Sequence, residues 1–200
     1  MMQATTMTLR TQLLLVFLLT LAFSTLTGCA AALVVGLGAG VVVAHDRRSA
    51  GAFVDDAVIE FKAEAELASD PKLKGPVHIN ITSMNGIVLL TGEAATAELH
   101  DRVLALVRKV PNIRRITNEI RIAPPSALGT RSQDGWISTQ VKGRFVGTKG
   151  LDPTRVKVVT ENAVVYLMGL VASPEGELAA NAASAVRGVT QVVKLFEYID

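Results

Sequence analysis

The sequence predicts an α+β protein in which two tandem αββαβ domains follow an export signal. Three observations predict it: a repeat of about 65 residues, apolar spacing that changes from helical to strand-like within each copy, and an apolar N-terminal region that ends in the only cysteine. A chain of 200 residues can hold two such small domains. We expect each domain to be a small three-stranded mixed sheet packed by two helices.

The repeat is carried by matching segments in the two halves of the chain. Residues 56–59 match residues 134–137, and residues 77–92 match residues 154–169. A repeat of this kind marks a repeated structural unit, and a stretch with Pro, Ser and Gly between the copies is typical of a linker. We therefore expect domains at 49–123 and 134–200, joined by a linker at 124–133.

Each copy predicts the same order of elements. Apolar residues at four-residue spacing predict a first helix, whose buried stripe is Ile59, Ala63 and Leu67 in one copy and Ile137, Val141 and Phe145 in the other. A hairpin follows, with its turn at Asn85-Gly86, because both residues tolerate positive φ. Asn162-Ala163 is the weaker equivalent. Second helices are expected at about 95–109 and 175–187, and last strands at 113–122 and 192–199.

The N-terminus has the pattern of an export signal. Arg10 supplies the positive charge, and 13–26 is an apolar region too short for a comfortable membrane span, which needs about 20 residues. The four residues that end at Cys29, Leu-Thr-Gly-Cys, resemble the lipobox of bacterial lipoproteins. That resemblance implies a cleaved signal peptide at 1–28 and acylation of Cys29. Ala30 in place of an aspartate favours the outer membrane.

The segment after Cys29 is open to three interpretations. Residues 30–44 are apolar and contain three glycines. They are short for a span, so they could lie in or on the membrane, or form a flexible spacer with poor helix propensity. A third interpretation is an uncleaved anchor in which 13–43 enters and leaves the bilayer. We assign 29–48 to a lipidated N-terminus and apolar tether.

The repeated unit resembles the BON domain, named for bacterial osmotically induced and nodulation proteins. The strand endings Val88-Leu89-Leu90-Thr91-Gly92 and Val165-Tyr166-Leu167-Met168-Gly169 look like the family's strand with its characteristic glycine. With the lipobox, the chain is similar to dual-BON outer-membrane lipoproteins associated with division and envelope stress. The resemblance implies phospholipid binding by the second domain, septal localisation and a role in envelope integrity.

No catalytic, cofactor or metal site is expected from the sequence. The histidines His45, His78 and His100 lie far apart and outside any metal-ligand spacing, and His78 should face outward from its strand. The glycine run at 36–40 does not follow a strand of a βαβ unit, so it is not a nucleotide loop. Asp55-Asp56 is interpreted as the cap of a helix N-terminus. An enzyme is therefore not expected.

The first helix of the second domain is the candidate lipid-binding surface. Its outward side carries the only tryptophan, Trp136, with small residues and basic side chains but no acid between Trp136 and Leu151. Tryptophan favours the membrane–water interface, and each Lys or Arg near an anionic surface contributes about 1 kcal/mol. The candidate residues are Trp136, Gln140, Lys142, Gly143, Arg144, Val146, Gly147 and Lys149.

Other partners follow from other interpretations of the same features. Trp136 could instead pack against the other domain or the linker. The expected partner is an anionic phospholipid membrane, such as one containing phosphatidylglycerol. The rival hypothesis is a protein–protein adaptor, for example for the outer-membrane protein assembly machinery or cell-wall enzymes. Basic residues are few and aromatics are 4%, so nucleic acid is not an expected partner.

Overall fold

The computed structural model describes residues 47–200 of the chain. The predicted signal peptide 1–28, the predicted lipidation site Cys29 and almost all of the predicted tether 29–48 lie outside the described residues. Residues His45–Asp200 belong to one compact unit, which holds both repeats. Within the described part of the chain, no helix has the length and apolar character that a membrane crossing requires.

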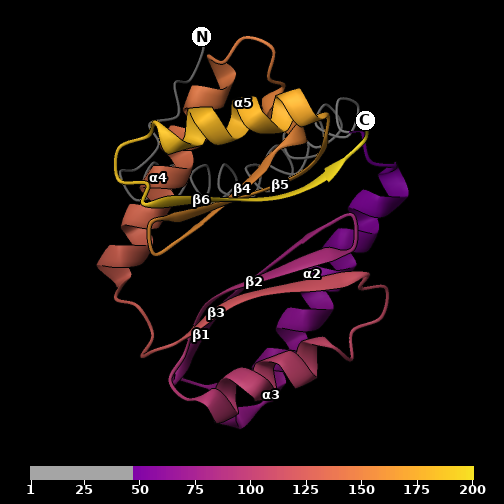
Figure 1. Cartoon of the computed structure of the whole chain (residues 1–200). Coiled ribbons are helices and arrows are strands. Elements are labelled where there is room, and N and C mark those ends of the chain that lie inside the picture. Colours follow the sequence, from indigo (N-terminus) through magenta and orange to yellow (C-terminus); the bar gives the residue numbers. More distant parts are fainter. Residues whose placement is uncertain (1–46) are drawn as a thin grey trace, which may run out of the picture. The chain divides into compact units, whose positions relative to one another are not determined.

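The first repeat folds in the expected αββαβ order (Figure 1). A short 3-10 turn, η1 (Pro71–Leu73), follows the first helix. The main elements are α2 (Ala50–Ser69), β1 (Val77–Met84), β2 (Ile87–Ala94), α3 (Ala97–Val107) and β3 (Arg115–Ile122).

The second repeat has the same order, but its first helix starts earlier than expected. Helix α4 (Leu128–Val146) begins inside the segment 124–133 that the sequence assigns to a linker. The remaining elements are η2 (Pro153–Arg155), β4 (Lys157–Glu161), β5 (Val164–Val171), α5 (Ser173–Ser184) and β6 (Gln191–Tyr198). The irregular linker between the two repeats is therefore only the short segment between β3 and α4.

Both sheets are mixed, as expected. In each, the middle strand pairs antiparallel with its hairpin partner and parallel with the strand that returns after the second helix. The hairpin turns have positive φ at Asn85 and Gly86 in one copy and at Asn162 and Ala163 in the other. Positive φ is unfavourable for alanine, so the second turn needs stabilising contacts from another part of the chain.

A buried carboxylate from the first helix of each domain supports these turns. Asp56 accepts hydrogen bonds from the backbone N–H of Asn85 (2.7 Å) and Gly86 (2.8 Å). Asp134 does the same for Asn162 (2.9 Å) and Ala163 (2.8 Å). The expectation that Asp55-Asp56 caps a helix N-terminus is wrong, because α2 begins at Ala50 and its cap is Ser49.

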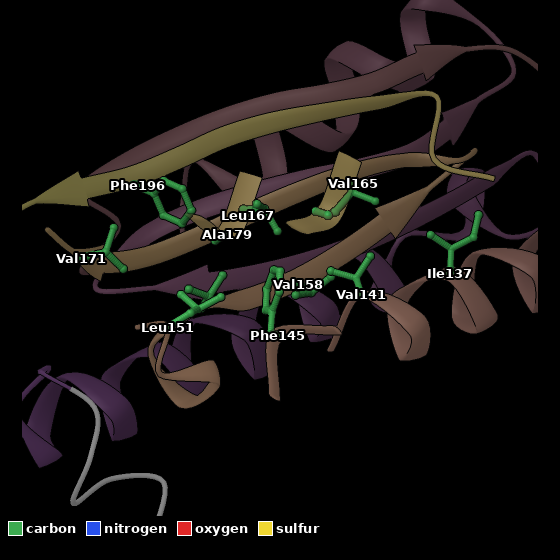
Figure 2. Packing of buried hydrophobic residues seen from close by; sticks show 12 residues of the cluster. Ile137, Val141, Phe145, Leu151, Val158, Val165, Leu167, Val171, Ala179 and Phe196 are labelled. Atoms are coloured by element: carbon green, nitrogen blue, oxygen red, sulfur yellow. The ribbon is translucent and has the colours of Figure 1, made fainter. Parts of the chain in front are cut away.

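The helices cover one face of each sheet and form its core. Figure 2 shows Val141 and Phe145 of α4 pointing toward Val158 and Leu167 of the second sheet. Under the first sheet, Ala63 and Leu67 hold the places equivalent to Val141 and Phe145. Ala63 is buried next to Ile59, and Leu67 is partly buried. The predicted stripes on the two first helices are confirmed.

The glycine near the end of each hairpin is required by close backbone packing. A Cβ at Gly92 would overlap the carbonyl oxygen of His78, and Gly92 has a φ of +112°. A Cβ at Gly169 would overlap the carbonyl oxygen of Arg155. Glycine is therefore the residue that lets the neighbouring backbone approach so closely.

The opposite faces of the two sheets are buried too, which the sequence did not predict. β2 is buried along its whole length. Met84, Ile87 and Leu89 of the first domain form one apolar cluster with Tyr166 and Met168 of the second. Burial raises the pKa of Tyr166 to about 12. Each β-sheet is therefore packed on both faces within this unit.

Candidate membrane-binding helix

Helix α4 exposes large apolar side chains along its outward face. Leu128 is 78% exposed, Trp136 63% and Val146 75%. Leu128 and Val146 are five helical turns apart and so point the same way, and Trp136 lies about 80° from them around the helix. Single exposed apolar side chains are common on protein surfaces, so these residues indicate a contact surface only together with the basic side chains around them. Leu128 is missing from the sequence-based set because it falls in the expected linker.

The structure leaves every residue of the sequence-based candidate set exposed; Gly147 and Lys149 lie just beyond the end of α4. Their role in lipid binding stays a prediction. The exposed residues are Trp136, Gln140, Lys142, Gly143, Arg144, Val146, Gly147 and Lys149.

Part of this set lines a groove with a volume of about 960 Å³. Trp136, Gln140, Gly143 and Arg144 lie along the α4 side. Residues 185–188, which follow α5, form the other side. Lys142, Val146, Gly147 and Lys149 do not line it.

Arg187, on the far wall of the groove, is a residue that sequence reasoning missed. The sequence places it in the second helix, at a position matched by Arg108 in the first domain, whereas in the structure α5 ends at Ser184 and Arg187 follows it. No sequence signal says that this end of α5 comes to lie beside α4. The groove therefore adds a second arginine to the basic side chains of the helix.

The basic side chains of this surface are available for a partner. Among residues 47–200, neither Lys142, Arg144 nor Lys149 forms an ion pair with a carboxylate. Two other lysines of the second domain, by contrast, are paired: Lys157 with Glu60 of the first domain (2.8 Å) and Lys194 with Glu177 (2.6 Å). These three basic side chains therefore form no ion pair that holds the described part of the fold together.

Gly135 and Gly143, in the interior of α4, have no packing role among the described residues. A Cβ added at Gly135 or Gly143 would meet nothing within 4 Å. Glycine in a helix interior costs roughly 0.5–1 kcal/mol relative to alanine. Stability alone would thus favour alanine, whereas glycine leaves the surface around Trp136 flat.

Comparison with known proteins identifies the repeated unit. The BON domain family model matches residues 55–124 and 133–200. The chain belongs to the BON domain family. The matched segments cover both αββαβ copies, so the resemblance and the fold class drawn from the sequence are confirmed.

Relatives cover most of the chain. The Outer membrane lipoprotein DolP of Haemophilus influenzae is 36% identical over 175 residues, which is 88% of this chain and 91% of that protein. The 21 kDa hemolysin of Actinobacillus pleuropneumoniae is 37% identical over 154 residues, 77% of this chain and 79% of the relative. The Osmotically-inducible protein Y of Escherichia coli is 24% identical over 157 residues, 77% of this chain and 78% of its own length.

Proposed function

We propose that this BON-domain protein is a lipid-anchored binding protein on the periplasmic face of the outer membrane. Its second BON domain contacts anionic phospholipid through α4, and the contact supports envelope integrity and cell division. The main support is that Trp136 is exposed beside basic side chains that form no ion pair with a carboxylate of the described residues. The proposed location at the outer membrane is supported by the lipobox at Cys29 and by the relative named as an outer membrane lipoprotein.

The chemistry of the α4 surface suits a bilayer headgroup layer. An indole ring is stable at the membrane–water interface, where Leu128 and Val146 can enter beside it. Each of the four basic residues Lys142, Arg144, Lys149 and Arg187 adds about 1 kcal/mol near an anionic surface. A lipid on Cys29 would keep α4 at high effective concentration near one bilayer, so a weak headgroup contact is sufficient.

Cosedimentation with vesicles tests the proposal. Residues 47–200, with the fold verified by circular dichroism, are mixed with phosphatidylcholine vesicles that contain or lack phosphatidylglycerol, at low and high salt. We expect binding only to the anionic vesicles, and weaker binding at high salt because exposed charges are screened. Binding to both lipids alike, or none to either, would contradict the proposal.

Trp136→Glu is the decisive variant, because it places a carboxylate where the indole would enter the membrane. We expect it to lose binding to the anionic vesicles while circular dichroism stays unchanged. Val58→Glu, at the equivalent position of α2, is the matched control and should bind as the wild type does. Unchanged binding by Trp136→Glu would rule out this surface.

A protein–protein adaptor is the second candidate function, and α2 favours it. Phe61 is 71% exposed, and it shares an outward stripe with Val54 and Val58. Acidic residues flank this stripe, so it does not suit an anionic bilayer but could bind a basic partner protein. Site-specific crosslinking from Phe61 in cells tests this function. A crosslinked envelope protein would support it, and crosslinks to lipid alone would not.

A further inference from the structure

Three potential metal ligands meet on the sheet faces that are buried between the two BON domains. His78 on β1, Glu93 on β2 and Glu161 on β4 place their ligand atoms within 4.8 Å of one another. These residues are far apart in the sequence, so no motif with a fixed spacing predicts that they lie together. The expectation that no histidine belongs to a metal site rested on sequence spacing alone.

The two carboxylates are buried side by side. Glu93 is fully buried and Glu161 is 5% exposed. Arg121 pairs with Glu93 at 3.2 Å, but its own side chain is 57% exposed. Within residues 47–200, no Lys or Arg forms an ion pair with Glu161. Arg131 also lines the cavity beside Glu161, but among residues 47–200 it forms no ion pair with either carboxylate. Burying charges without full compensation is unfavourable.

The pKa values of the two carboxyl groups are shifted in opposite directions. Burial raises the pKa of Glu161, and the neighbouring carboxylates Glu93 and Asp134 raise it further, against the opposing effects of Asn80 and His78. Burial also disfavours the charged form of Glu93. There, hydrogen bonds from Asn162, Ser126 and Arg121 outweigh burial and hold the pKa below its usual value.

Polar neighbours already orient the carboxylates. The Asn80 amide donates to Glu161 at 2.7 Å, and the Asn162 amide donates to Glu93 at 2.5 Å. Such outer partners fix the direction of ligand oxygens in metal sites. His78 and Glu161 also line a cavity of about 110 Å³, which offers a path for an ion and room for bound water.

We propose that His78, Glu93 and Glu161 bind one divalent transition-metal cation, best fitted by Zn²⁺, which links the two BON domains. One imidazole and two carboxylates are a ligand set that zinc accepts, with water completing a tetrahedron. Calcium and magnesium prefer oxygen ligands alone, so they fit this set less well. A doubly charged ion would neutralise both buried carboxylates at once.

Zinc binding to the full chain in detergent micelles tests the proposal. The protein is stripped with a chelator and dialysed against Zn²⁺ or Ca²⁺. Bound metal is then measured together with the thermal unfolding midpoint. We expect one zinc per chain, a higher midpoint with zinc, and no such effect of calcium. A ligand that binds only the folded state raises its stability in this way.

Variants separate this site from adventitious binding. His78→Ala and Glu161→Gln should each lose the zinc and the rise in the midpoint, and Asn80→Ala should weaken zinc affinity roughly 10- to 100-fold. The matched controls are His100→Ala and Glu177→Gln, which change an exposed histidine contact and an exposed ion pair. They should bind zinc as the wild type does.

Two results would overturn the proposal. The first is a wild-type chain that holds no zinc. The second is zinc retained equally by His78→Ala and Glu161→Gln, as expected for an ion held elsewhere on the chain. Glu161→Gln also tests whether removing the buried negative charge stabilises the protein without a metal. In chelator it should be at least as stable as the wild type, yet zinc should stabilise only the wild type.

Discussion

Helices α2 and α4 occupy the same place in two copies of one fold, yet they present opposite surfaces. Both bury a matching stripe against a sheet, Ile59 and Ala63 in one and Ile137 and Val141 in the other. Both leave large apolar side chains exposed. The exposed charges differ, because α2 carries acids where α4 carries bases at equivalent positions.

That difference shows which features of the helices the fold does not require. Glu64 and Glu66 of α2 correspond to Lys142 and Arg144 of α4, and all four side chains are exposed. A BON domain folds with either charge pattern, so packing cannot explain the choice. We infer that the two helices serve different partners, a bilayer for α4 and a protein for α2.

The largest expected difference in stability concerns the buried aspartates of the two helices. Asp56 supports its turn and also forms an ion pair with the buried Arg48 at 2.6 Å, whereas Asp134 supports only its turn among the described residues. We expect Asp56→Ala to lower the free energy of unfolding by about 3–5 kcal/mol. Asp134→Ala should lower it by about 1–3 kcal/mol. Urea unfolding measures both, and the reverse order would contradict this account of the turns.

Equivalent charged positions should differ in their effect on membrane affinity. Arg144→Gln removes one cation from the α4 surface and should weaken binding to anionic vesicles by about 1 kcal/mol, roughly fivefold. Glu66→Gln, at the same position of α2, should leave vesicle affinity within about twofold, because that helix is not at the bilayer. Equal effects of the two changes would mean that net charge, rather than α4, governs binding.

The smallest expected effect distinguishes the glycine of α4 from its counterpart. Gly143→Ala should raise the free energy of unfolding by roughly 0.5–1 kcal/mol, because the new Cβ meets nothing within 4 Å. Ala65→Gly, at the equivalent exposed position of α2, should lower it by about as much. Thermal unfolding compares the two. A destabilising Gly143→Ala would reveal a packing role for this glycine.

Most of the fold could be predicted from the sequence because local chemistry agrees with the global arrangement. The four-residue stripe through Ile137, Val141 and Phe145 predicts the face of α4 that is buried. Asn85-Gly86 predicts the turn between β1 and β2. The exposure of Trp136 also follows from its angle to that stripe.

The remaining features depend on contacts between distant segments. The start of α4 at Leu128 was missed because Pro124-Pro125 and Gly129 are typical of a loop. Asp56 was misassigned because its partners, the turn N–H groups, are far along the chain. The cluster of His78, Glu93 and Glu161 exists only because the two sheets bury their second faces together.

Tryptophan fluorescence provides the most direct test that α4 rather than α2 meets the membrane. Trp136 is the only tryptophan in the chain and is 63% exposed, so its emission reports on this one surface. Anionic vesicles should shift the emission to shorter wavelength, and lipids brominated near the headgroup should quench it, because the indole enters the interface. Protein that binds these vesicles with unchanged, unquenched emission would contradict the account.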